Sequence, residues 1–246
     1  MSDNLQPRGS DDTTFAQPLY TPIKRRSFFM YAGATAGATA LVLAGCSKDS
    51  NTMTNNPALV NVGSTGADDI GVLNYAYALE QLEAAFYTSV RNGAYYKGLG
   101  AATAEKQIFD DLYAHEVIHR ELFKAALGTK AIKDLTPNFT AINFDARASV
   151  LGTAKAFEDL GVAAYNGAGR FINSAAYLLL AGKIVSVEAR HAALIRDLLV
   201  ESSFVGSDIV TVGSTSLEIS KSPTDVAATA NMFLADGSKL DVSGLK

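Results

Sequence analysis

Cysteine, histidine and tryptophan are scarce in this chain of 246 residues, which has one cysteine, three histidines and no tryptophan. With Cys46 alone, the chain can form no internal disulfide and no zinc site that needs several cysteines. Any metal site must therefore draw mainly on carboxylates. An excess of positive charge is lacking as well. The formal net charge is −4 and no basic cluster stands out, so we expect no nucleic-acid partner.

The composition is that of a folded protein. Apolar residues make up 48% of the chain and charged residues 19%, which excludes an intrinsically disordered chain. The length is sufficient for one domain of about 150 to 200 residues with its own hydrophobic core, or for two small domains.

The first 46 residues have the pattern of a bacterial export signal. A basic group that ends in Arg25 and Arg26 precedes nineteen uncharged residues, 27–45, which are rich in alanine and glycine. The arginine pair followed by Ser-Phe-Phe resembles a twin-arginine signal, and the ending Leu-Ala-Gly-Cys resembles a lipobox, in which Cys46 carries the lipid. An uncleaved membrane anchor is the alternative, because nineteen residues just span a bilayer. We expect a lipoprotein of the bacterial cell envelope, periplasmic or on the cell surface, whose partner is the membrane that holds Cys46.

The rest of the chain divides into three segments. Residues 47–66 are polar and small, and are expected to form a flexible tether. Residues 67–202 are predicted to form a helical bundle, and 203–246 a C-terminal extension with one short helix. The predicted helices lie at about 68–91, 101–127, 148–165, 174–201 and, after the capping pair Ser222-Pro223, 223–234.

Several finer expectations accompany these helices. Asp68 and Asp69 suit the first turn of the first helix, and Asn166-Gly167 the end of the third. The third and fourth helices are apolar nearly all round, which implies burial, and Arg196 is expected in a rim ion pair of small energy. Residues 206–221 are predicted as loop or short strands.

The connectivity predicts the fold class. Two helices, a gap of some twenty residues at 128–147 and then two more helices indicate an all-α, ferritin-like four-helix bundle with a long crossover.

One chemical pattern occurs twice in the bundle. A lone glutamate is followed seven residues later by a tyrosine, and 36 or 30 residues after the glutamate by Glu-x-x-His. In a helix, positions i and i+3 share a face and positions i and i+7 nearly coincide. Each Glu-x-x-His therefore presents both side chains to one side, and each tyrosine lies under its glutamate. The pattern consists of Glu80, Tyr87, Glu116 and His119 in the first half, and Glu158, Tyr165, Glu188 and His191 in the second.

This is the ligand pattern of di-iron and di-manganese carboxylate bundles, and the sequence resembles the ferritin-like superfamily. Residues 79–87 and 157–165 resemble more narrowly the exported, desiccation-related ferritin-like domain proteins, and the resemblance covers about 68–234. It implies a site for two Fe or Mn ions, a choice that oxygen-rich ligands without thiolate also favour. In that site Glu116 and Glu188 bridge, Glu80 and His119 bind one metal, and Glu158 and His191 bind the other.

Three nearby residues have more than one interpretation. Glu83 competes with Glu80 for the ligand position. Glu80 is preferred because Tyr87 repeats the relation of Tyr165 to Glu158, which leaves Glu83 as an acid behind the ligands or as a third ligand. Tyr87 and Tyr165, the candidate catalytic residues, are either core aromatics or hydrogen-bond donors to ligands.

A zinc protease is the rival interpretation of one segment. Residues 115–119 match H-E-x-x-H, in which His115 and His119 bind zinc, Glu116 is the general base and Glu158 is a possible third ligand. The motif leaves Glu80, Glu188 and His191 without a purpose. In the bundle, His115 is instead a flanking residue about 100° from Glu116.

Function is less constrained than fold. The leading hypothesis is redox chemistry on oxygen species, by ferrous oxidation or by peroxide removal of a peroxidase-like or catalase-like kind. A non-catalytic structural or desiccation-stress bundle is the second hypothesis, and the zinc protease is the third. The sequence leaves the metal, the substrate and the oligomeric state open.

Overall fold

The computed structural model describes residues 59–211 and 215–246. The expected export signal with Arg25, Arg26 and Cys46 lies outside the described residues, as does most of the expected tether. Within the described ranges, no helix is long and apolar enough to cross a membrane.

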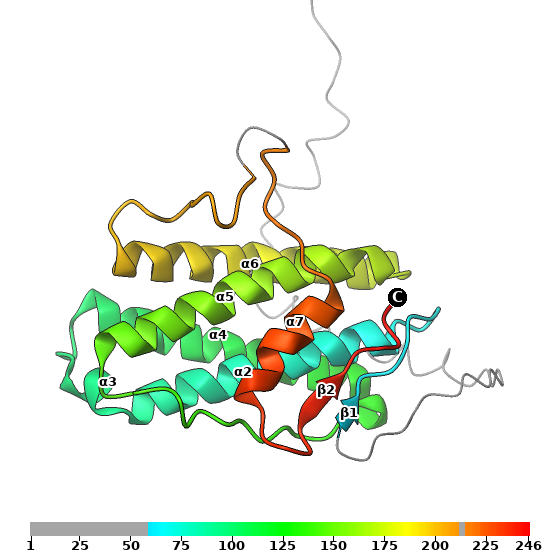
Figure 1. Cartoon of the computed structure of the whole chain (residues 1–246), viewed down its shortest axis with the longest axis horizontal. Helices are drawn as coiled ribbons and strands as arrows, with labels where there is room; N and C mark the ends of the chain where they lie inside the picture. The colour runs from blue at the N-terminus through cyan, green and yellow to red at the C-terminus, as the bar shows by residue number, and fades with distance from the viewer. Residues whose placement is uncertain (1–58, 212–214) are drawn as a thin grey trace, which may run out of the picture. The chain divides into compact units, whose positions relative to one another are not determined.

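Six α-helices dominate the described chain, four of them long (Figure 1). Helix α2 packs along α4, and α5 packs along α6, so that two helical hairpins form the bundle. The predicted all-α class, four-helix bundle, long crossover and extra C-terminal helix are confirmed. The helices are α2 (Ile70–Asn92), α3 (Ala94–Gly98), α4 (Ala104–Leu127), α5 (Arg147–Ala168), α6 (Ala175–Leu199) and α7 (Pro223–Ala230).

The crossover from α4 to α5 is held against α2 by two buried amide side chains. Asn74 accepts a hydrogen bond from the Ile132 backbone, 2.9 Å, and donates one to the Lys130 carbonyl, 3.0 Å. Two helical turns further along α2, the Gln81 side chain accepts a hydrogen bond from the Leu135 backbone N–H, 2.8 Å. A long loop that satisfies its backbone groups in this way can lie flat along the bundle.

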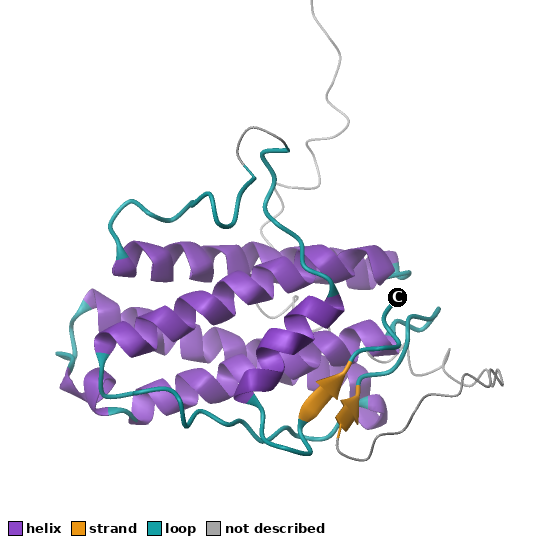
Figure 2. Ribbon diagram, in the orientation of Figure 1, coloured by secondary structure: helices purple, strands orange, loops and turns teal. Residues whose placement is uncertain are grey.

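A two-stranded parallel sheet was not predicted. Strand β1 (Leu59–Asn61) pairs with β2 (Lys239–Asp241), drawn in orange in Figure 2, and buries Val60 and Leu240. The sheet joins the first described residues to the last ones.

Helix α7 begins as predicted, because the Ser222 hydroxyl caps it by accepting a hydrogen bond from the Asp225 backbone N–H. The described parts of the preceding stretch, 206–211 and 215–221, form loop with one isolated antiparallel bridge between Val210 and Glu218.

Two helix boundaries differ from the expected ones for physical reasons. Helix α5 continues past Asn166-Gly167, and Gly167 instead provides space, because a Cβ there would lie 1.8 Å from the Lys221 carbonyl oxygen. Asp69 precedes α2 rather than joining its first turn. It is fully buried, and its carboxylate accepts hydrogen bonds from the backbones of Asn173 and Ser174, both 2.8 Å. It thereby positions the start of α6.

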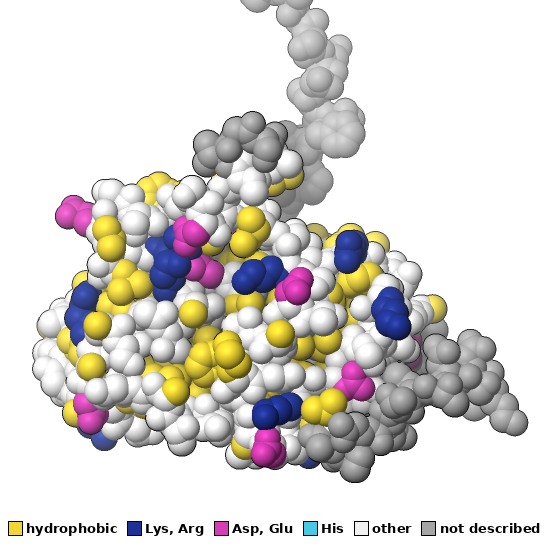
Figure 3. Space-filling view, in the orientation of Figure 1, with side chains coloured by type: hydrophobic (Ala, Val, Ile, Leu, Met, Phe, Trp, Pro, Cys, Tyr) yellow, Lys and Arg dark blue, Asp and Glu magenta, His cyan; other side chains and the backbone are white. Residues whose placement is uncertain are grey.

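Helix α6 is buried on one face only, so the expectation of burial all round was wrong for this helix. Ile184 and Ile195 are buried, whereas Leu178 and Leu179 are 48% and 63% exposed. Figure 3 shows apolar side chains interspersed with acidic and basic ones over one face of the molecule. The buried face of α6 also carries Glu188 and His191.

Candidate metal centre

Four glutamates meet in the interior of the bundle, one from each long helix. Glu80 comes from α2, Glu116 from α4, Glu158 from α5 and Glu188 from α6, and all four have 0% exposure. An ionised carboxylate costs several kcal/mol when it is buried without compensation. Four of them in one interior therefore require positive charge, either protons or metal ions.

Two imidazoles supply nitrogen atoms to the same space. His119 Nδ1 lies 2.9 Å from Glu188 Oε1 and 3.4 Å from the nearer oxygens of both Glu80 and Glu116. This nitrogen therefore faces a carboxylate from each of three helices.

The second imidazole repeats the arrangement in the other half of the bundle. His191 Nδ1 lies 2.8 Å from Glu116 Oε1, 3.4 Å from Glu158 Oε2 and 3.7 Å from Glu188 Oε2. Glu116 and Glu188 thus each turn one oxygen toward each histidine. Only these two carboxylates are shared between the halves.

The six side chains form two overlapping groups that can hold metal ions. Within each group the ligand atoms all lie within 4.8 Å of one another. One group consists of Glu80, Glu116, His119 and Glu188, and the other of Glu116, Glu158, Glu188 and His191. The structure therefore brings together all six side chains that the repeated pattern singled out.

The contacts between these groups are short without being hydrogen bonds. Both Nδ1 atoms are buried, and neither has a hydrogen-bond partner in the described structure. The same holds for both oxygens of Glu116 and of Glu188. Buried polar atoms are rarely left in this state. Within each group these atoms lie close enough together to share a cation.

Protons take the place of metal charge in the metal-free cluster. Burial raises the pKa of Glu80 well above its ordinary range, and raises the pKa of Glu158 to about 8. Burial also opposes ionisation of Glu116, yet His119 and His191 outweigh it and hold its pKa at about 2. The same carboxylates overcome burial at both histidines and raise each pKa to about 12. Imidazolium ions and protonated acids thus neutralise the interior.

Both tyrosines of the pattern donate hydrogen bonds to cluster glutamates, across the two halves. The Tyr87 hydroxyl on α2 donates to Glu158 on α5, and the Tyr165 hydroxyl on α5 donates to Glu80 on α2. Of the two interpretations, the hydrogen bond to a pattern glutamate is the one observed. The sequence placed each tyrosine under the glutamate of its own helix, and did not indicate that the bonds would cross.

Glu83 lies behind the cluster and not in either group. It is 5% exposed, and burial raises its pKa well above the ordinary range, with a further rise from Glu188 and Glu116. Its carboxylate sits against Gly161 of α5, where an added Cβ would be 3.0 Å from Glu83 Oε1. The missing side chain at Gly161 therefore makes room for a fifth buried acid.

His115 is more than the flanking residue that was expected. Its Nδ1 lies 2.8 Å from His191 Nε2, and the two rings are nearly coplanar and edge to edge, with centroids 5.1 Å apart and planes inclined by 20°. Burial, with His191 and His119 nearby, lowers the pKa of His115 below 6.5, which favours the neutral ring. His115 belongs to neither of the two ligand groups, so it does not join His119 around a common point as a zinc motif requires.

Arg196 was misjudged as a rim residue. It is 3% exposed and donates to both oxygens of Asp159, at 2.8 and 2.7 Å. It also donates to both oxygens of Asp208, at 3.0 and 2.8 Å. This forked pairing joins α6 to α5 and to the loop that follows α6. The spacing patterns of the sequence concern residues of one helix, so they did not indicate this contact between segments.

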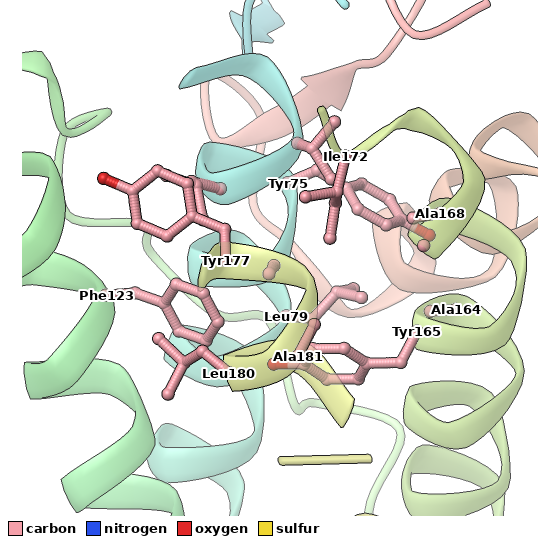
Figure 4. Close-up of a pocket in the computed structure, with 14 residues that line it drawn as sticks. Tyr75, Leu79, Phe123, Ala164, Tyr165, Ala168, Ile172, Tyr177, Leu180 and Ala181 are labelled. Carbon is pink, nitrogen blue, oxygen red and sulfur yellow. The ribbon is translucent and has the colours of Figure 1, made fainter. Parts of the chain in front are cut away.

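An apolar cavity of about 30 Å³ adjoins the cluster (Figure 4). Tyr165 extends from α5 into its lining beside Leu79 and Ala181, so one ring contributes both to the cavity wall and to the hydrogen bond with Glu80. The interior next to the carboxylates is therefore lined by apolar side chains on this side.

Comparison with known proteins agrees with the geometry. The model of the ferritin-like domain family matches residues 68–201, more than half of the chain and all four long helices. Among curated proteins, none matches the chain. The buried cluster of glutamates and histidines lies within the matched residues. The chain therefore belongs to the ferritin-like domain family.

Proposed function

We propose that this protein is a ferritin-like metalloprotein of the bacterial cell envelope, and that it holds two iron or manganese ions. Its activity is redox chemistry on oxygen species, either oxidation of ferrous iron or removal of peroxide, and it serves stress protection, including protection during desiccation. The expected export signal and the expected lipid at Cys46 support the part of the proposal that concerns the cell envelope.

One observation carries the proposal. Eight buried ligand atoms of the six side chains lack hydrogen-bond partners and converge on two neighbouring points. Two divalent cations would cancel the charge of four carboxylates. Carboxylate and imidazole ligands without thiolate suit iron or manganese better than a structural zinc.

The residues of the chain have distinct tasks in this proposal. Glu116 and Glu188 would contribute to holding both ions, because each has one oxygen facing His119 and the other facing His191. The hydroxyls of Tyr87 and Tyr165 hold the terminal carboxylates of Glu158 and Glu80 in one orientation. Burial of all four carboxylates keeps bulk water out. When bound, a pair of such ions supplies two electrons that can be exchanged with dioxygen or peroxide.

The test is to load metal-free protein with ferrous or manganous ions, count the bound ions, and measure ferrous oxidation in air and consumption of hydrogen peroxide. Glu116→Gln keeps the size of the side chain but removes the charge that both ions share, so this variant should lose both ions and both activities. Glu121→Gln is the matched control. Glu121 lies on the same helix, but it is exposed and paired only with Arg120, so this variant should behave as wild type.

The alternatives predict different results. Two bound ions with neither activity would overturn the redox proposal in favour of a structural bundle. A single bound zinc that is lost in His115→Ala would overturn it in favour of the protease.

A further inference from the structure

We propose that His115 is a positioning residue which fixes the ring of His191, and that it thereby makes the two metal positions unequal. The inference rests on the proposed dinuclear centre and deepens it. It also gives a role to the first histidine of the H-E-x-x-H segment, which the six-ligand site leaves unused.

The contact has a defined direction. His191 Nδ1 faces Glu116 and Glu158, so its Nε2 is the nitrogen left to bond outward, and that atom meets His115 Nδ1 at 2.8 Å. An imidazole that binds metal through Nδ1 must carry its proton on Nε2. Nε2–H of His191 therefore donates, and Nδ1 of His115 accepts.

Coplanarity adds a second restraint. The two planes are inclined by only 20° with centroids 5.1 Å apart, so the rings meet edge to edge across the 2.8 Å contact. A hydrogen bond that lies in the plane of both rings limits rotation of the His191 ring as well as its tautomer. Groups that hold the outer nitrogen of a metal-bound histidine orient the ring and raise its basicity, and their loss commonly costs 10-fold to 100-fold in metal affinity.

The other half of the pattern cannot make this contact. His115 directly precedes Glu116, and the residue that directly precedes Glu188 is Val187. A valine side chain has no atom that can accept a hydrogen bond from an imidazole. Among the residues that the structure describes, none forms a hydrogen bond with the outer nitrogen of His119, so we expect the position of His191 and Glu158 to bind its ion more tightly.

The experiment titrates metal-free protein with Co²⁺, whose visible absorption reports its ligands, and compares three variants with wild type. His115→Leu removes the acceptor, His115→Asn restores one through Oδ1 at a similar place, and Val187→Leu is the matched control in the other half. Wild type should show two binding events of different affinity. His115→Leu should weaken the tighter event about 10-fold to 100-fold and leave the other unchanged. His115→Asn should recover most of the loss, and Val187→Leu should resemble wild type.

A second readout does not depend on metal. In NMR spectra of the metal-free protein, the Nε2 proton of His191 should exchange slowly in wild type and in His115→Asn, and rapidly in His115→Leu. Equal affinities in wild type, or no difference between His115→Leu and wild type, would overturn the inference. A slowly exchanging proton in a wild-type protein that binds no Co²⁺ would show that the contact exists while the dinuclear centre does not, and the inequality of two metal positions would then be overturned with it.

Discussion

The hydroxyl of Tyr165 donates a hydrogen bond to Glu80, although the two residues belong to different helical hairpins and lie 85 positions apart. The bond from Tyr87 to Glu158 runs in the opposite direction between the same two helices. Each tyrosine therefore orients the carboxylate of the half to which it does not belong, and the two halves of the site depend on each other. A hydrogen-bonded carboxylate keeps one oxygen occupied and presents the other, which is what a terminal ligand requires.

Removing one of these hydroxyls should weaken binding of the metal ion that the carboxylate holds in the proposed site. We predict that Tyr165→Phe lowers the affinity of one metal position about 10-fold to 100-fold, and that Tyr87→Phe does the same to the other position. Calorimetric titration of metal-free protein measures both. Tyr177→Phe is the control, because Tyr177 lines the same cavity but its hydroxyl points away from Tyr165 (Figure 4). Unchanged affinities in both pattern variants would show that the tyrosines are only core aromatics.

The metal-free protein should lose stability as the pH rises from about 6 to 9. The folded state raises the pKa of His119 and His191 to about 12 and that of Glu158 to about 8, so it binds more protons than the unfolded chain does in this range. Stability then falls with pH, by up to about 1.4 kcal/mol per pH unit for each extra proton.

Thermal or urea unfolding across this pH range measures the effect. Bound ions displace those protons, so the metal-loaded protein should show a much weaker fall. A metal-free protein whose unfolding free energy rises with pH between 6 and 9 would contradict the proton balance described above.

Substitution by alanine should change stability differently at two glycines of α5. Gly152 is exposed and an added Cβ there would meet no neighbouring atom, so Gly152→Ala should stabilise the protein by about 0.5–1 kcal/mol through helix propensity. In Gly161→Ala the new Cβ would press on the Glu83 carboxylate at 3.0 Å and approach Glu188 Oε2 at 3.9 Å. We expect this variant to gain no stability and to bind metal more weakly. Equal stabilisation by both substitutions would show that the space beside Glu83 is not restricted.

The buried guanidinium of Arg196 should contribute to the stability of the fold and not to metal binding, because it contacts none of the six proposed ligands. Arg196→Met leaves Asp159 and Asp208 with Lys155 as their remaining partner, and it should cost about 2 kcal/mol through the lost hydrogen bonds to charged groups. Arg120→Met, which removes an exposed pair with Glu121, should cost less than about 1 kcal/mol. Urea denaturation compares the two variants, and similar losses would mean that the contact with Asp159 is worth no more than a surface pair.

The ligand face of each helix could be predicted from the sequence because helical periodicity is local. Spacing of three places Glu116 beside His119 in any α-helix, whatever the helix packs against. The crossing of the tyrosine bonds could not be predicted, because it depends on how α2 and α5 approach each other in space. The same limit explains the missed parallel pairing of β1 with β2, whose three-residue strands are separated by most of the chain.

Other misjudgements came from residues whose local and tertiary roles differ. Gly167 is of a residue type that is common at helix ends, yet here its missing side chain makes room for the Lys221 backbone to contact α5. Asp69 has the position of a first-turn acid, yet it binds the loop before α6. The exposed leucines of α6 give the same hydrophobic signal as buried ones, so composition alone predicted burial all round.

Metal analysis of protein produced with its export route intact is the most direct test of the dinuclear site. We predict close to two iron or manganese ions per chain, and an empty site in Glu188→Ala, which removes an oxygen from each position. A protein that retains no transition metal after careful purification, or that retains one zinc ion released by His115→Ala, would contradict it.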